Sequence, residues 1–245
     1  RYPLRLVFCH ECSLVQIDHT VAPEELFCND YPYFSSVSDA LQVHTIANVK
    51  DILSRRVLGP DSLVVELASN DGYLLKHYKQ AGLKVLGIDP AEAPAKAAQA
   101  IGVDTLIDFF TVELARSLAA KGMAADVLHA NNVLAHVADT NGFVEGIARL
   151  LKPTGVAVRE CPYPRVLIGH GDFDTIYHQH LCYFSVTAVD KLFRRHGLFL
   201  NDIRRTPIHG GSLRLFVEPV ERVGPAVTEL LALEEKLGLT RVEYF

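Results

Sequence analysis

The chain contains 245 residues, of which 49% are hydrophobic and 22% are charged, and its formal net charge at pH 7 is −5. This composition is typical of a globular protein with a substantial core, the acidic balance argues against nucleic acid or an anionic membrane as a partner, and no apolar stretch is long enough to cross a bilayer. Five cysteines, an odd number and mostly scattered, do not resemble a secreted disulfide framework, so we expect a cytoplasmic protein.

The first 30 residues are expected to be short and irregular, and a loop rich in Tyr and Ser follows at 31–39. A helix is predicted at 40–58, where apolar residues recur at helical spacing. The elements predicted after it are strand 63–67, helix 73–81, strand 85–88, helix 91–101, strand 104–107, helix 112–121, strand 126–130, helix 140–151, strand 156–161, helix 186–196, and strands 198–204 and 213–217. This alternation predicts an α/β fold, a mainly parallel sheet with helices on both faces, which binds ligands at the carboxyl ends of its strands.

The loop after the first strand of this sheet is acidic. Strand 63–67 runs into 66-ELASNDGYL-74, so that Glu66 ends the strand and Asn70-Asp71-Gly72 lead into a helix. Gly72 can take backbone angles closed to other residues. The glycine fingerprint of dinucleotide-binding folds and the P-loop are both missing, and a carboxylate at the strand end repels a pyrophosphate. The loop therefore suits a ligand with positive charge, amines and a ribose.

Acidic residues also follow the next two strands. Asp89-Pro90 ends strand 85–88, where a carboxylate can accept both hydroxyls of a ribose. Asp108, Phe109 and Phe110 follow strand 104–107 and could hold an adenine by a hydrogen bond and an apolar wall. Each acid alone could be a capping or solvated residue, but their placement at successive strand ends predicts binding of S-adenosylmethionine.

Two amides and a histidine follow the fourth strand. Asn131, Asn132 and His136 lie in 131-NNVLAHVAD-139 and reach the same edge of the sheet. His136 could face the methyl group of the donor or could be a packed loop histidine. The residues expected to bind the donor are Glu66, Ala68, Asn70, Asp71, Gly72, Asp89, Pro90, Asp108, Phe109, Phe110, Asn131 and Asn132.

The stretch 174-DTIYHQHLCYFS-185 follows the fifth strand and starts at the ligand edge. Methyl transfer to carbon needs a base that removes a proton next to a carbonyl, and donors that hold the growing oxyanion. Tyr177, His178 and His180, with His136 opposite, suit that task. In an extended chain Tyr177 would share one face with Gln179 and the two histidines the other, and a turn would change this. A His-x-His metal site and an aromatic core with satisfied histidines are the alternatives.

Five segments taken in order resemble the nucleotide-sugar C-methyltransferases that act on carbon 3 of a dTDP-4-keto-deoxysugar in antibiotic biosynthesis. The segments are YPYFSSVSD, VVELASNDGYLL, NNVLAHVAD, FDTIYHQHLCYFS and HGGSLR. The resemblance covers essentially the whole chain. It implies a class I methyltransferase domain at 31–220, preceded at 1–30 by part of a small zinc-binding domain and followed at 221–245 by the start of a sugar-binding domain or a linker helix.

The resemblance also implies a structural zinc ion in a longer polypeptide. The zinc site of the family uses four cysteines, of which Cys9 and Cys12 match the later pair, while the earlier pair would lie upstream. Two thiolates alone leave two positions of a tetrahedron empty. Cys28 is a poor substitute ligand from its spacing. We therefore expect this sequence to be a segment of a longer protein, with a monomer as the expected state.

Several site residues carry over from the family by position. The resemblance implies that His180 is the base, that Tyr177 orients the substrate and that His136 lies near the keto group of the sugar. It also implies substrate contacts by a further set: Tyr31, Tyr33, Ser35, His178, His209 and Arg214. The family has Glu where this chain has Gln179, an amide that cannot ionise. Natural variation and an introduced replacement of Glu are both open.

The reaction expected is deprotonation of sugar carbon 3 by His180, followed by attack of the enolate on the methyl group and release of S-adenosylhomocysteine. No catalytic metal is expected, because the keto group is the electron sink. Methylation at oxygen or nitrogen of another small molecule on the same scaffold is one alternative, and a non-catalytic binding module is the other.

Overall fold

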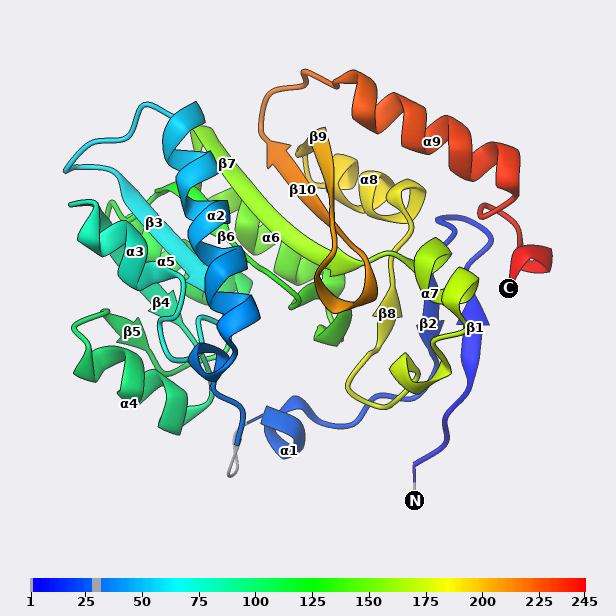
Figure 1. Ribbon diagram of the computed structural model, residues 1–245, viewed down its shortest axis with the longest axis horizontal. Helices are drawn as coiled ribbons and strands as arrows, with labels where there is room; N and C mark the ends of the chain where they lie inside the picture. Colours follow the sequence, from blue (N-terminus) through cyan, green and yellow to red (C-terminus); the bar gives the residue numbers. More distant parts are fainter. Residues whose placement is uncertain (1, 28–31) are drawn as a thin grey trace.

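The computed structural model describes residues 2–27 and 32–245 (Figure 1). Its centre is a seven-stranded sheet in the order β5-β4-β3-β6-β7-β10-β9. The strands are β3 (Leu63–Leu67), β4 (Lys84–Ile88), β5 (Thr105–Leu106), β6 (Ala125–His129), β7 (Leu151–Pro162), β9 (Phe199–Thr206) and β10 (Ser212–Glu218). The first five pair in parallel, whereas β10 pairs antiparallel with both β7 and β9. The predicted mainly parallel sheet is confirmed.

Helices cover both faces of this sheet, because neighbouring strand residues point to opposite sides. Val64 packs in one buried cluster with residues of α2 (Asp39–Arg55), α3 (Leu75–Gln80) and α4 (Glu92–Ala100). Val65 packs in the other cluster with residues of α5 (Val112–Ala120), α6 (Thr140–Leu150) and α8 (Val186–Arg195). The near-continuous apolar strands of the sequence are therefore strands buried on both faces.

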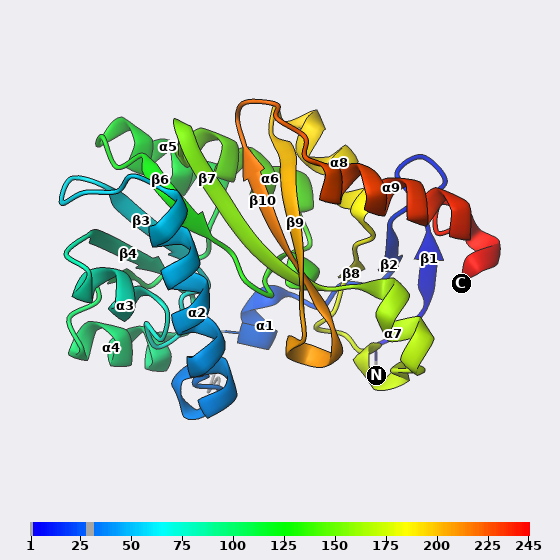
Figure 2. The ribbon, with the colours of Figure 1, turned by 45° about the horizontal axis from the view of Figure 1, so that its top comes forward.

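The last helix, α9 (Pro225–Leu237), is packed onto this domain. Figure 2 shows α8 and α9 side by side next to β9. Val227 and Leu230 belong to the same apolar cluster as the core strands. The buried carboxylate of Glu234 accepts hydrogen bonds from the backbone N–H groups of Val186 and Thr187, at 2.7 and 2.8 Å, and thereby caps the start of α8.

The N-terminal segment is more regular than the sequence predicts. It contains β1 (Leu6–Phe8), β2 (Val15–Ile17) and α1 (Pro23–Phe27), where an irregular segment was expected. Strands of three residues are too short to show an alternating pattern, and these two depend on a distant partner. β2 pairs antiparallel with β8 (Cys182–Tyr183), so that β1, β2 and β8 form a second, three-stranded sheet.

Short helical elements lie outside the large sheet. The unpredicted helix α7 (Pro164–His170) follows β7. The single-turn 3₁₀ elements are η1 (Ser35–Val37), η2 (Leu134–His136), η3 (Phe173–Thr175), η4 (Ile208–Gly210) and η5 (Val242–Tyr244). Within residues 2–27 and 32–245, no helix has the length and apolar character needed to span a bilayer.

Candidate functional site

The loop between β3 and α3 has an unusual backbone. Ala68 and Asn70 have φ values of 51° and 49°, in the left-handed region that side chains disfavour. Gly72 has φ 75°, and a Cβ there would lie 3.2 Å from Ala98 of α4, so glycine is required on both grounds. Asp89 holds this turn to the end of β4, because its Oδ2 accepts the N–H of Asn70 at 2.7 Å.

Buried acidic groups gather at this edge. Burial, and then the charges of Asp89 and Asp71, raise the pKa of Glu66 well above its usual range. Burial also raises the pKa of Asp89, against the lowering effect of the backbone N–H groups of Ala91 and Asn70. Several buried side-chain oxygens here have no hydrogen-bond partner among the described residues: Glu66 Oε2, Asp71 Oδ1, Asn131 Oδ1 and Asn132 Oδ1. Unsatisfied buried acceptors are costly, and a ligand with N–H, O–H or positive charge would satisfy them.

The loop that precedes α2 lies directly on this turn. The N–H of Ser35 donates to Asn70 Oδ1 at 2.8 Å, and the N–H of Ser36 donates to Asp71 Oδ2 at 3.1 Å. The side-chain amide of Asn70 donates to the carbonyl of Tyr33 at 3.0 Å. The structure therefore brings Ser35 and Tyr33 to the predicted donor site through their backbones. Tyr31 lies outside the described residues.

The residues proposed for the adenine continue the same edge. The N–H of Asp108 donates to the carbonyl of Asp89 at 3.2 Å, which places the two acids in adjacent loops. The Asp108 carboxylate is exposed and accepts the N–H of Phe109. Phe110 packs edge-to-face against Phe143 of α6, with ring centroids 5.5 Å apart. Both rings are half-buried, and this contact anchors Phe110 in the protein.

A second cluster forms around His180. The chain turns at 178–179, and the N–H of His180 donates to the carbonyl of Tyr177 at 3.0 Å. This turn replaces the extended arrangement and brings Tyr177 and His180 together, with ring centroids 4.3 Å apart. The ring of His178 points away, and its Nε2 lies 3.1 Å from the carbonyl oxygen of Pro3.

The tautomer of His180 follows from its contacts. Its Nδ1 lies 2.8 Å from the carbonyl oxygen of Thr175, which only accepts, so Nδ1 carries the proton when the ring is neutral. Nε2 is then the basic nitrogen and lies 3.2 Å from the hydroxyl of Tyr177, which donates.

His136 joins this cluster from the loop after β6. Its ring centroid lies 5.0 Å from that of His180, and its Nδ1 donates to the carbonyl of Gln179 at 2.7 Å. The N–H of Leu181 donates to the carbonyl of Ala135 at 2.7 Å and fixes the two loops together. Burial, and then the charge of His180, lower the pKa of His136 to about 4, so this imidazole is neutral near pH 7.

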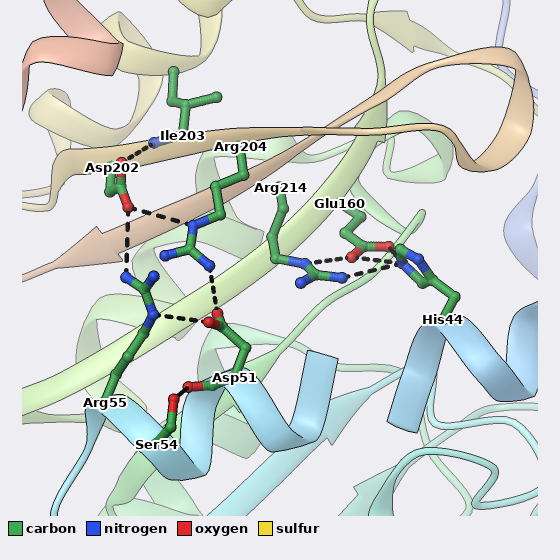
Figure 3. A network of polar contacts seen from close by, with 9 residues as sticks. All are labelled: His44, Asp51, Ser54, Arg55, Glu160, Asp202, Ile203, Arg204 and Arg214. Carbon is green, nitrogen blue, oxygen red and sulfur yellow. Dashed lines mark hydrogen bonds and ion pairs between the residues drawn. The ribbon is translucent and has the colours of Figure 1, made fainter. Parts of the chain in front are cut away.

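Arg214 does not present a free guanidinium. Its Nε donates to Oε1 of Glu160 on β7 at 2.6 Å, and only 8% of its side chain is exposed. His44 of α2 contacts both oxygens of the same carboxylate, at 2.9 and 2.8 Å (Figure 3). Glu160 and His44 were not predicted from the sequence. Glu160 ends the fifth predicted strand, a position like those of Glu66 and Asp89, and that placement could have identified it. The side chain of His209 lies outside the described residues.

The two N-terminal thiols lie next to each other. Backbone N–H groups, first that of Cys12, lower the pKa of Cys9, whereas burial raises the pKa of Cys12. Among the described residues no group of three or more His, Cys, Asp or Glu side chains could hold a metal ion. Cys9 and Cys12 are thus two thiols, whereas a tetrahedral structural zinc site has four ligands, and Cys28 lies outside the described residues.

Family models match most of the chain. Residues 42–201 match the model described as "Methyltransferase domain". Residues 1–27 match the model described as "Putative zinc binding domain".

Two curated proteins illustrate the sequence similarity. The chain is 35% identical over 241 residues to the C-methyltransferase NovU of Streptomyces niveus, an alignment that covers 97% of this chain and 57% of that protein. It is 33% identical over 95 residues to the ubiquinone biosynthesis O-methyltransferase of Bartonella quintana (strain Toulouse), or 38% of each chain. The chain thus spans just over half the length of the first of these relatives and less of the second.

Solved structures share the fold. The magnesium protoporphyrin IX methyltransferase ChlM from Synechocystis PCC 6803, solved with bound SAH, matches with a TM-score of 0.57 and 17% identity over 72% of this chain and 82% of that one. The PH0226 protein from Pyrococcus horikoshii OT3 matches with a TM-score of 0.60 and 15% identity over 78% and 97% of the two chains. The predicted class I methyltransferase fold is confirmed.

Proposed function

Since the chain belongs to the methyltransferase domain family, we propose that it carries out S-adenosylmethionine-dependent methylation of carbon 3 of a dTDP-4-keto-deoxysugar. The observation that carries this proposal is the cluster of Tyr177, His180 and His136 beside the acidic strand ends. The similarity to a C-methyltransferase over 97% of the chain supports transfer to carbon. A place in antibiotic biosynthesis is part of the proposal and rests on the resemblance of the sequence motifs.

S-adenosylmethionine matches the buried side-chain oxygens at the strand ends that have no hydrogen-bond partner among the described residues. Asp89 would accept the ribose hydroxyls, and Glu66 and Asp71 would face the cationic methionine part. Phe109 would pack against the adenine, and the exposed carboxylate of Asp108 would accept a hydrogen bond from it. S-adenosylmethionine supplies an electrophilic methyl group when bound, and a buried acidic surface stabilises its positive charge.

His180 is the proposed base. Because Nδ1 is held by the carbonyl of Thr175, Nε2 points its lone pair toward the side on which Tyr177 lies. Nε2 takes the proton from sugar carbon 3, and the electron pair of that bond moves into the enolate. Protonated Nε2 then donates to the hydroxyl oxygen of Tyr177, whose O–H turns to donate a hydrogen bond to the enolate oxygen. His136, whose Nδ1 proton is held by the carbonyl of Gln179, borders the cluster. The new carbon–carbon bond forms as the sulfur–methyl bond breaks, and the proton on His180 is lost to water.

The N-terminal segment is proposed to be the remainder of a structural zinc domain at 1–30. Cys9 and Cys12 would provide two thiolates, and the backbone N–H groups around Cys9 favour its thiolate. The catalytic domain would occupy 31–220. Residues 221–245, with α9 packed on that domain, would be the start of a sugar-binding domain or a linker helix, and the enzyme is proposed to act as a monomer.

The experiment that tests this function uses a set of dTDP-4-keto sugars, methyl-labelled S-adenosylmethionine and deuterated water. We expect the label on carbon 3 of one of these sugars and deuterium exchange at the same carbon. Label on oxygen or nitrogen, without exchange, would instead support the O-methyltransferase alternative that the similarity to the ubiquinone enzymes favours. Binding of S-adenosylhomocysteine without transfer to any sugar, even after Gln179→Glu, would indicate a non-catalytic module.

A further inference from the structure

An imidazole of α2 is held by a buried carboxylate of β7. His44 lies on α2, and its Nε2 is 2.8 and 2.9 Å from the two oxygens of Glu160, whose side chain is 2% exposed. Arg214 of β10 donates to the same carboxylate (Figure 3).

The carboxylate fixes the tautomer of His44. Burial raises the pKa of Glu160, but the hydrogen bonds and charges of His44 and Arg214 outweigh it, and the pKa lies below its usual range. An ionised carboxylate only accepts, so Nε2 of His44 carries a proton and donates it. In the neutral ring Nδ1 is therefore a hydrogen-bond acceptor that faces away from Glu160. Since 15% of the His44 side chain is exposed, a ligand can reach the ring.

The backbone of β7 places this pair beside the proposed site. The N–H of Ala130 donates to the carbonyl of Val158 at 3.1 Å, and the N–H of Asn132 donates to the carbonyl of Glu160 at 2.8 Å. Glu160 therefore adjoins the loop after β6 that leads to His136.

We propose that His44 is a further substrate-binding residue of this site, and that its Nδ1 accepts a hydrogen bond from a hydroxyl group of the acceptor sugar. The inference rests on the proposed function and extends it to substrate selection. A sugar hydroxyl matches Nδ1 of His44, because an acceptor nitrogen pairs with an O–H donor, whereas keto and phosphate oxygens are themselves acceptors. Glu160 and Arg214 are positioning residues that act through His44, and the guanidinium of Arg214 is committed to Glu160.

The test compares pairs of dTDP-4-keto sugars that differ in one hydroxyl group. Wild-type protein is expected to prefer the hydroxylated member of one pair by about 10- to 100-fold in kcat/KM, the range for one lost hydrogen bond in a closed site. His44→Ala should reduce that preference to less than threefold, mainly through KM of the hydroxylated sugar. Glu160→Gln should lower it in part. His196→Ala is the matched control, because that ring contacts Asn141 of α6, on the other face of the sheet.

Thermal unfolding and calorimetric binding of S-adenosylhomocysteine establish that each variant is folded. If His44→Ala does not fold, His44→Gln, which keeps a hydrogen-bonding group of different reach, replaces it and should also lose the preference. A folded variant that keeps the wild-type preference, or a wild type that shows no preference in any pair, overturns the role of His44 and leaves the proposed function intact. A wild type that methylates no keto sugar overturns the proposed function, and the role of His44 with it.

Discussion

The Nε2 atom of His180 lies 3.2 Å from the hydroxyl oxygen of Tyr177, and the two residues are joined by a single turn of the chain. The relationship depends on contacts distant in sequence. β2 pairs with β8 immediately after His180, and the N–H of Ile17 donates to the carbonyl of Leu181 at 2.9 Å. The N-terminal segment therefore contributes to the shape of the proposed catalytic cluster, and the cluster requires it to be folded.

Replacement of the proposed base is the most direct prediction. His180→Asn removes the basic nitrogen and should abolish exchange of the carbon 3 proton with deuterium, measured by NMR or mass spectrometry. The exposed histidine of α7 provides the control, and His170→Asn should exchange at the wild-type rate. Wild-type exchange in His180→Asn would remove His180 from the role of base.

Gln179→Glu should raise the turnover number, because a carboxylate can orient a neighbouring imidazole or pass a proton. The backbone carbonyl of Gln179 accepts a hydrogen bond from the Nδ1–H of His136, so a change of the Gln179 side chain leaves that contact in place. Gln179→Leu, which removes hydrogen bonding, is the companion variant and should be slower than wild type. Equal turnover of the Gln and Glu forms would show that the position needs only a hydrogen-bonding partner.

Asp89→Ala should weaken binding of S-adenosylhomocysteine by about 10- to 100-fold, which corresponds to about 1.4 to 2.8 kcal/mol. The loss has two sources, the ribose hydroxyls and the N–H of Asn70 that Asp89 holds at 2.7 Å. Titration calorimetry measures it, with the exposed Asp104→Ala as control. Unchanged affinity in Asp89→Ala would reject the assignment of the ribose.

His129 makes stability depend on pH. Burial lowers its pKa to about 3, and its Nε2 lies 2.8 Å from the hydroxyl of Tyr78. In the folded protein it stays neutral down to that pH, while in the unfolded chain it takes up a proton below about pH 6.5. The unfolded state thus binds more protons, and the free energy of unfolding should fall as pH is lowered from about 6.5 toward 3, by up to about 1.4 kcal/mol per pH unit.

Denaturant titrations at several pH values measure this dependence. His129→Gln should reduce the slope by up to that amount, and the exposed His170→Gln should leave it unchanged. Comparison of slopes between variants cancels the contribution of the carboxyl groups, including the raised pKa values of Glu66 and Asp89, which act in the opposite sense. An identical slope in His129→Gln and wild type would contradict the prediction.

Glu234→Ala should lower the free energy of unfolding by about 3 to 5 kcal/mol, because three charge-assisted hydrogen bonds are lost and backbone N–H groups at the start of α8 are left buried without a partner. Chemical denaturation measures the change. Its exposed neighbour provides the control, and Glu235→Ala should change stability by less than about 0.5 kcal/mol. Similar values for the two variants would contradict the cap.

The alternation of apolar runs with helical patterns predicted the large sheet well, including the two-residue β5 between two predicted helices. Strand 63–67 agrees with β3 to the residue, and helix 112–121 agrees with α5 to within one. β1, β2 and β8 were not predicted, because they lie outside this alternation and form a sheet by pairing between residues far apart in the chain.

The site divides in the same way. Local sequence predicts which residues reach the site, namely the acids after β3 and β4 and the residues of YHQH. The reason is that parallel strands bring their carboxyl ends to one edge of the sheet. The contact partners of individual side chains cannot be predicted from local sequence. That His178 faces Pro3 while His180 faces Tyr177 depends on one turn, and that Arg214 and His44 both bind Glu160 depends on packing between β7, β10 and α2. Charges and tautomers are properties of such three-dimensional neighbours, whereas the choice of fold is a property of the pattern along the chain.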